Sequence, residues 1–206
     1  MTPKPPQTEP QYHPDNDAAV ADNGMYHLLA RLWLYEVDEP LLLELTTAPM
    51  RELYLAAGGR LPSNADPTAQ TIDDLAVDYC QLFVGPQQVA PPYQSVWLTG
   101  EFQGKPVESM QQFVDVIRFN VKRLPPGTML DHLGTQLLVM AALNQALTSE
   151  FIPQTVLEIR SEFFRRHLLW PERLLAAAEK HSQTPFYRSL ATVTREFLNW
   201  EGRRIA

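Results

Sequence analysis

The fold is decided by residues 18–37, which read AAVADNGMYHLLARLWLYEV. Apolar side chains recur in this stretch at spacings of three and four residues, the period of one face of an α-helix: Met25, Leu28, Leu29, Leu32 and Tyr35. Trp33 broadens the apolar stripe. The stretch therefore predicts a long amphipathic helix that buries one side in a core.

The same helical period recurs along the rest of the chain, whereas strand patterns are nearly absent. Prolines stand at or near the start of several of these segments, where a helix tolerates them best. Further helices are expected from Pro40, from Pro49 and over residues 71–83, 107–124, 130–148, 153–167, 171–180 and 185–200. We therefore predict one compact all-α domain of about nine to eleven helices over residues 18–206, after a disordered, Pro-rich tail at residues 1–17.

Composition narrows the possible functions. The chain has 206 residues, a net charge of −7 and one cysteine, Cys80, which excludes a disulfide framework and a Cys-rich metal site. Residues 1–150 carry 8 Lys and Arg against 18 Asp and Glu, while residues 151–206 carry 9 against 6. This balance argues against a nucleic-acid partner and suits a basic peptide, although acidity can also serve solubility alone. No stretch approaches the roughly 18 apolar residues of a membrane-spanning helix.

Three clusters of residues stand out as candidates for function. The first is DYCQLFVGP at residues 78–86, where a helix ends on an aromatic residue and then breaks sharply. The second is PPYQSVW at residues 91–97, and the third is DHLG at residues 131–134, at the start of a helix. Residues 85–106 hold too many Gly and Pro for one helix, yet they are rich in large apolar side chains. Such irregular segments in a compact domain usually serve a function.

An enzymatic interpretation rests on Asp131 and His132. Neighbours on a helix point about 100° apart, so these two side chains are poorly placed to bond one another, although both could face one cleft. His27 and His167 could complete a metal site, but each lies within an apolar stripe, where a core or boundary histidine is the commoner case. No nucleophile elbow, phosphate loop or zinc-protease motif is present. For Cys80 we expect a small buried thiol.

A binding interpretation uses the same clusters. Prolines stiffen the loop that would present Tyr93 and Trp97, which lowers the entropy cost of binding. Leu82 and Phe83 could form an apolar wall, and an Asp at its edge could meet an Arg of a ligand. This layout suits a peptide that carries basic and apolar residues. On physical grounds the alternative, that these large side chains are simply core, stays open.

The three clusters, in this order, resemble the signature of the TorD/DmsD family, and the segment Pro185-Phe186-Tyr187-Arg188 resembles its DmsD-like members. The resemblance implies a cytoplasmic all-α chaperone that is not an enzyme and needs no cofactor or metal. Such chaperones bind the twin-arginine leader of a molybdopterin oxidoreductase precursor of the DMSO reductase family, assist cofactor insertion and release the precursor to the twin-arginine translocase. They occur as monomers or homodimers.

The resemblance also implies a set of peptide-binding residues. Carried over position by position, they are Tyr79, Leu82, Phe83, Gly85, Pro86, Pro92, Tyr93, Ser95, Val96, Trp97, Asp131, His132 and Leu133. Two other functions remain open: an assembly chaperone of the NarJ type for a respiratory subunit that is not exported, and an Asp/His metal-dependent hydrolase.

Overall fold

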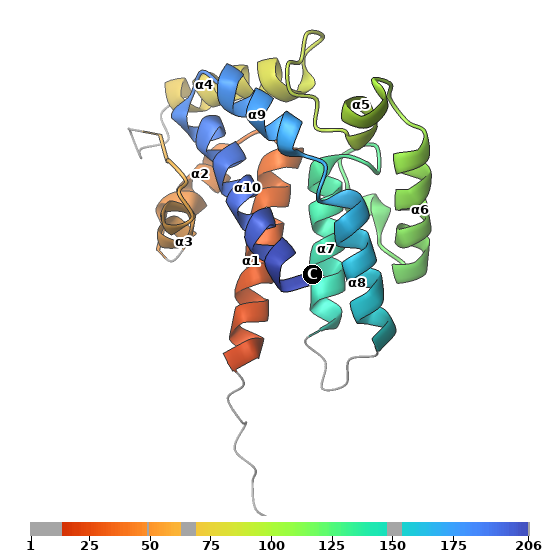
Figure 1. Ribbon diagram of the computed structural model, residues 1–206. Coiled ribbons are helices and arrows are strands. Elements are labelled where there is room, and N and C mark those ends of the chain that lie inside the picture. The colour runs from red at the N-terminus through yellow and green to blue at the C-terminus, as the bar shows by residue number, and fades with distance from the viewer. Residues whose placement is uncertain (1–13, 49, 63–68, 148–153, 206) are drawn as a thin grey trace, which may run out of the picture.

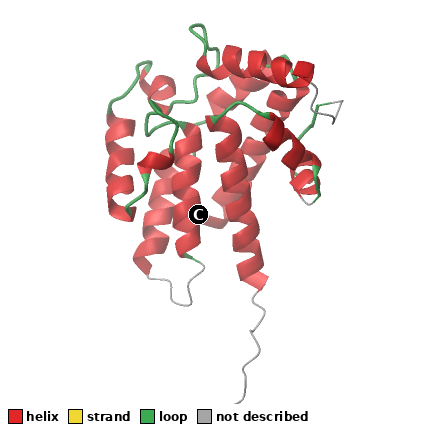
Figure 2. Ribbon diagram, turned by 180° about the vertical axis from the view of Figure 1, so that it is seen from behind, coloured by secondary structure: helices red, strands yellow, loops and turns green. Residues whose placement is uncertain are grey.

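The computed structural model describes residues 14–48, 50–62, 69–147 and 154–205. Within these ranges the chain forms ten α-helices and no β-strand, which confirms the predicted all-α fold and its number of helices (Figure 2). A π-helical turn occupies Cys80–Val84 and a 3-10 turn Val121–Arg123. The α-helices are α1 (Pro14–Leu34), α2 (Glu39–Thr46), α3 (Met50–Ala56), α4 (Ala69–Tyr79), α5 (Gln94–Thr99), α6 (Lys105–Ile117), α7 (Leu133–Ala146), α8 (Gln154–His167), α9 (Glu172–His181) and α10 (Pro185–Ile205).

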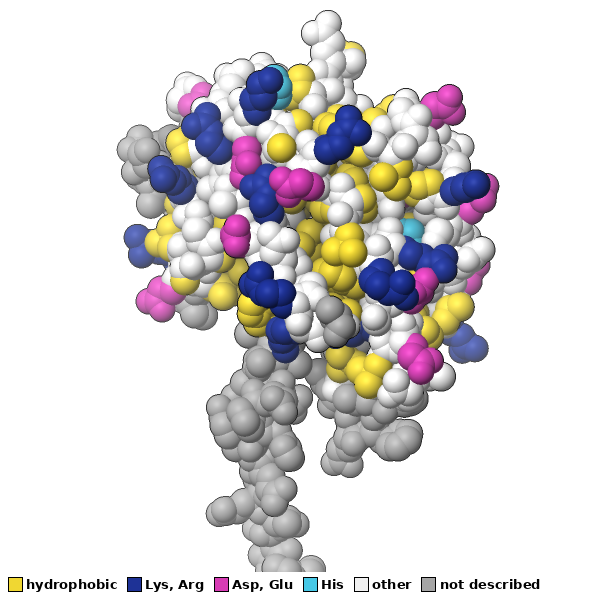
Figure 3. All heavy atoms as spheres, in the orientation of Figure 1, with side chains coloured by type: hydrophobic (Ala, Val, Ile, Leu, Met, Phe, Trp, Pro, Cys, Tyr) yellow, Lys and Arg dark blue, Asp and Glu magenta, His cyan; other side chains and the backbone are white. Residues whose placement is uncertain are grey.

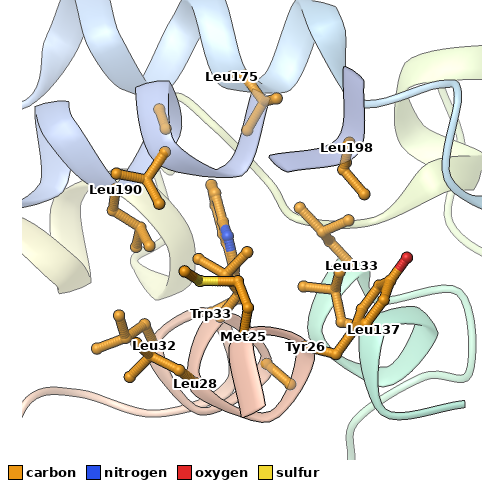
Figure 4. Close-up of a cluster of buried hydrophobic side chains, with 14 of the residues drawn as sticks. Met25, Tyr26, Leu28, Leu32, Trp33, Leu133, Leu137, Leu175, Leu190 and Leu198 are labelled. Carbon is orange, nitrogen blue, oxygen red and sulfur yellow. The ribbon is translucent and has the colours of Figure 1, made fainter. Parts of the chain in front are cut away.

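The predicted apolar stripe of α1 is the centre of the core. In Figure 1, α1 runs through the middle of the molecule, with α7 beside it and α10 crossing in front of it. Its side chains meet those of α7, α9 and α10 in one buried cluster (Figure 4). Leu29, Leu32 and Trp33 are completely buried. Because full burial of such a side chain contributes about 1.5–3 kcal/mol, this stripe supplies much of the driving force for folding.

Polar contacts tie the first described helix to the last one. The indole Nε1 of Trp33 donates to Oγ1 of Thr194 over 3.0 Å. The hydroxyl of Tyr26 donates to the buried carboxylate of Glu201 over 2.9 Å, and Nη2 of Arg160 reaches the same oxygen at 3.0 Å. These buried groups are satisfied by one another, so they fix how α1 and α10 pack without leaving polar atoms unpaired.

α1 and α7 approach each other closely at one glycine. A Cβ atom built on Gly134 would lie 2.5 Å from Cγ of Leu34 and 3.0 Å from the carbonyl oxygen of Ala30. Any side chain at residue 134 would therefore push the two helices apart.

Several boundaries differ from those predicted. α1 begins at Pro14 instead of Ala18, and the remainder of the predicted tail, residues 1–13, lies outside the described residues. α6 ends at Ile117 instead of Leu124, because Arg118 adopts a left-handed conformation with φ 54°. The irregular stretch after Gly85 contains a short helix, α5, that was not predicted. The prediction of a buried thiol was wrong, since Cys80 is exposed.

Charged side chains of both signs are scattered over the face that carries α8, α9 and α10 (Figure 3). Many of them are paired: Arg195, for example, lies 2.9 Å from Oε2 of Glu172 and contacts Glu179 as well. None of the described helices combines the length and apolar character needed to cross a membrane.

Candidate functional site

The first wall of the candidate site comes from the π-helical turn that follows α4. The turn closes with a hydrogen bond of 2.6 Å from the amide of Gly85 to the carbonyl of Cys80. A Cβ atom on Gly85 would lie 2.9 Å from that carbonyl oxygen, so the close approach requires glycine. Single π-helical turns within helices are rare and often mark functional sites. Here the turn carries Phe83, whose ring lies 5.2 Å from that of Tyr79.

Asp78, next to Tyr79, fixes this wall to the far end of the chain. Its carboxylate accepts hydrogen bonds from the amides of Gln183 and Thr184, at 3.1 and 2.8 Å, and from the Thr184 hydroxyl at 2.6 Å. These groups precede α10 directly. The side chain is almost fully buried, so it positions the wall and does not reach a ligand.

The second wall is the loop of residues 91–97, which a short β-bridge joins to the start of α7. The amide of Leu133 donates to the carbonyl of Pro92 at 2.8 Å, and the amide of Gln94 to that of Asp131 at 3.0 Å. The carboxylate of Asp131 also accepts from the amide of Ser95 at 2.9 Å, so Asp131 caps α5 from outside that helix. The Asp131 side chain is completely buried.

His132 forms the base of the site. It is the N-cap of α7, with Nδ1 accepting a hydrogen bond of 3.0 Å from the amide of Gly134. The proton of the neutral ring therefore resides on Nε2, which no other described residue engages. Burial lowers the pKa of His132 to about 3, so the ring is neutral at physiological pH. The ring of Tyr93 packs edge-on against it at 5.1 Å.

These elements enclose a pocket of about 260 Å³. Five of the predicted peptide-binding residues line it: Tyr79, Phe83, Pro92, Tyr93 and His132. The remaining wall residues are not among the predicted peptide-binding residues; they include Leu34, Val84, Gln88, Phe102 and the turn of residues 126–128. The Pro-Pro-Gly signal at residues 125–127 marked only a helix break, and no local pattern showed that the turn folds back onto the site.

The other predicted site residues do not line this pocket. Ser95, Asp131 and Leu133 are fully buried supports of its walls. Val96 and Trp97 are half-buried on α5, and Trp97 donates through Nε1 to the carbonyl of Pro91 at 2.7 Å.

Leu82, Gly85 and Pro86 face the opposite side of the π-helical turn. There they line a separate hollow of about 480 Å³, together with Cys80 and His181.

A buried network holds the second wall against α7 and α8. Gln94 donates through Nε2 to the carbonyl of Arg166 at 2.7 Å, so its Oε1 is the acceptor for both Gln136 and His167. His167 must then donate from Nδ1, and its Nε2 accepts from the hydroxyl of Ser109 at 3.0 Å. Burial, and next the charge of Arg166, lower the pKa of His167 to about 4, which keeps the ring neutral.

An exposed carboxylate, that of Glu36, lies near Tyr79 in the wall of the pocket. Glu36 follows the end of α1, is exposed, and makes no ion pair with any described residue. Its neighbour in space, Tyr79, has a pKa raised first by burial and then by the negative charge of Glu36. The pocket thus combines aromatic walls, an imidazole N–H donor and a nearby negative charge.

Asp131 and His132 are not arranged as a catalytic pair. Each side chain accepts a hydrogen bond from a different backbone amide, that of Ser95 and that of Gly134. Within the described part of the chain no three His, Cys, Asp or Glu side chains gather as metal ligands. The two residues act as caps that join α5 and α7.

Comparison with known proteins agrees with this architecture. Residues 43–176 match the model of the nitrate reductase delta subunit family. The chain is 30% identical to the chaperone protein YcdY of Escherichia coli, with 84% of this chain and 89% of that protein covered. It is 25% identical to the chaperone protein TorD of Shewanella sp. MR-4, with 88% and 92% covered.

The fold also matches a solved structure. A crystal structure described as that of a redox enzyme maturation protein from Archaeoglobus fulgidus aligns with a TM-score of 0.53 and 19% identity, over 94% of this chain and 98% of that one. Family model, relatives and fold agree with one another. The chain therefore belongs to the nitrate reductase delta subunit family, among the TorD-type chaperones of redox enzyme maturation.

Proposed function

We propose that this chaperone binds the twin-arginine leader of a molybdopterin oxidoreductase precursor of the DMSO reductase family. It acts in the cytoplasm, where it holds the precursor during cofactor insertion and releases it to the twin-arginine translocase. The observation that carries the proposal is the pocket in which Tyr79, Phe83, Tyr93 and His132 converge from three separate segments.

The chemistry of the pocket suits such a leader. Aromatic walls can cover apolar side chains of the peptide, and the Nε2–H of His132 can donate to a peptide carbonyl. Glu36 can pair with a guanidinium outside the aromatic part, as a carboxylate that has no partner of its own. Because Glu36 is exposed, we expect it to contribute modestly, about 0.2–1 kcal/mol.

Titration with synthetic leaders tests the proposal. The probe is a labelled leader with an Arg-Arg pair, from a precursor whose gene lies next to the gene of this protein. We expect this leader to bind, and Tyr93→Ala should lower its affinity at least tenfold. Trp200→Ala is the matched control, since Trp200 is a partly exposed aromatic residue on α10 outside the pocket. Equal effects of the two variants, or no binding of any twin-arginine leader, would contradict the proposal.

A second function is favoured by the family match itself, which is to the nitrate reductase delta subunit. A NarJ-type chaperone would serve a subunit that is not exported. The same pocket would then take an N-terminal segment without a requirement for arginine. Replacing Arg-Arg by Lys-Lys in the peptide separates the two functions, because only a leader-specific chaperone loses affinity.

A further inference from the structure

A larger hollow lies beyond the turn of residues 126–128, between α6 and the segment that follows it. Its volume is about 930 Å³, near the upper end of the range of about 300–1,000 Å³ typical of ligand pockets. Pro126, Gly127 and Thr128 line both this hollow and the pocket of the candidate site. The two cavities are therefore neighbours that share one wall.

The way α6 ends creates the apolar side of this hollow. The amide of Phe119 donates to the carbonyl of Val114 at 2.9 Å, and the amide of Arg118 to that of Asp115 at 3.3 Å, the pattern of a Schellman motif. This motif brings Phe119 back over Val114, and both line the hollow. Leu124 and Leu130 add to the apolar surface.

The position that usually carries glycine in this motif is Arg118, with φ 54° and ψ 43°. A left-handed conformation is unfavourable for a side chain as large as arginine. The fold accepts this strain and thereby points a guanidinium to the rim of the hollow. Strained residues of this kind are concentrated at functional sites.

The hollow carries more positive than negative charge. Arg118 and Lys122 line it, and neither makes an ion pair with another described residue. The one carboxylate in the lining, Asp115, accepts a hydrogen bond of 2.8 Å from Gln111. The molecule as a whole has a charge of −7. At physiological ionic strength the screening length is only about 8 Å, so the electrostatic potential in the hollow is set mainly by the nearby cations and not by the net charge of the molecule.

We propose that this hollow is a second peptide-binding site, which takes an extended segment with alternating apolar and acidic side chains. The apolar groups lie against Phe119, Val114 and the two leucines, and the acidic groups pair with Arg118 and Lys122. The site differs in charge preference from the pocket beside Glu36 and does not depend on the function proposed for that pocket.

Fluorescence anisotropy with a defined probe tests this second site. The probe is a fluorescein-labelled peptide of three Glu-Leu-Asp-Phe repeats, and its counterpart carries Lys in place of Glu and Asp. In 150 mM salt we expect the full chain to bind the acidic peptide at least tenfold more tightly than the basic one. The double variant Arg118→Glu/Lys122→Glu should bind the acidic peptide at least tenfold more weakly.

The control is Lys180→Glu, which reverses an exposed cation on α9 and should leave the affinity within twofold. If the double charge-reversal variant does not fold, as judged by circular dichroism, Arg118→Gln/Lys122→Gln replaces it. We expect this variant to bind the acidic peptide about fivefold more weakly. Binding of a twin-arginine leader is measured on the same variants and should stay within twofold, so that failure of one site is distinguished from failure of the other.

Three results would overturn the proposal. The first is no saturable binding of the acidic peptide. The second is an affinity that the charge variants leave within twofold. The third is complete competition by millimolar inorganic phosphate, which would make the hollow a simple anion site and not a peptide site.

Discussion

Two glycine-to-alanine substitutions should change the stability of the protein in opposite directions, because only one of them lies at the contact between α1 and α7. Gly134→Ala on α7 places a methyl group 2.5 Å from Cγ of Leu34 and 3.0 Å from the backbone oxygen of Ala30. Gly24→Ala on α1 places the same group in open space, with nothing within 4 Å. The first change should destabilise the chaperone, and the second should stabilise it.

The magnitudes follow from the geometry. Overpacking of a tight core costs about 1–3 kcal/mol, and the backbone oxygen of Ala30 cannot move aside as the end of a side chain could. Gly134 is the second residue of α7, where the gain in helix propensity is small. We expect a net loss of about 2 kcal/mol, or a fall in Tm of about 4–8 °C for a chain of this size. Gly24→Ala should gain about 0.5–1 kcal/mol, because it replaces glycine inside a helix.

Thermal and urea unfolding of both variants, followed by circular dichroism, measure these changes. Leader binding should weaken in Gly134→Ala as well, because Leu34 lines the pocket and the amide of Gly134 holds His132. A Tm for Gly134→Ala equal to or above that of the wild type would refute the reasoning. It would mean that α1 and α7 separate without cost.

Three further predictions concern the caps, the histidines and α6. Asp131→Ala should lower the free energy of unfolding, measured with urea, by about 1–2 kcal/mol, because it removes the cap of the Ser95 amide. Asp131→Asn keeps an acceptor oxygen and should lower it less. Equal losses in the two variants would contradict this. His132 and His167 have pKa values lowered to about 3 and about 4, so as the pH falls the unfolded chain binds protons before the folded chain does. The free energy of unfolding is therefore undiminished above about pH 6.5. Below that it falls by up to about 1.4 kcal/mol per pH unit for each histidine as the pH drops toward those values. Urea midpoints at pH 7, 5.5 and 4.5 measure this loss, and His167→Gln should reduce its slope; an unchanged slope would argue against a neutral buried ring. Arg118→Gly should raise the free energy of unfolding by about 0.5–1 kcal/mol, because glycine adopts the left-handed conformation without strain. The same variant should bind the acidic peptide more weakly. A loss of stability would show that Arg118 is not strained.

The helices could be predicted from the sequence because their cause is local. The spacing of Met25, Leu28 and Leu32 makes one helix face apolar wherever that face is finally buried. The end of α6 could not be predicted in the same way. Val121 and Leu124 continue the apolar period, and only the left-handed Arg118 shows that the helix has stopped. The π-helical turn likewise leaves no mark in the pattern of residue types.

The pocket was predicted in part, for a related reason. Phe83, Tyr93 and His132 stand out from their local clusters, but the prediction that they share one site with Tyr79 rests on the family resemblance, which carries information on tertiary structure that periodicity lacks. Residues 126–128 reach the pocket only through the packing of distant segments, so no local signal marks them. The buried state of Asp131 also depends on its bond to Ser95 across a gap of 36 residues.

The contacts between α1 and α10 have a consequence for biosynthesis. Tyr26 bonds Glu201 across 175 residues, and Trp33 bonds Thr194 across 161. Asp78, beside the aromatic wall, accepts hydrogen bonds from residues 183 and 184, more than 100 positions further along the chain. On the ribosome, almost the whole chain must therefore emerge before the pocket has its walls in place. On the proposed function, a nascent copy should not bind a client before α10 has been made, and a copy truncated before α10 should be a substrate for proteolysis instead of a partial binder.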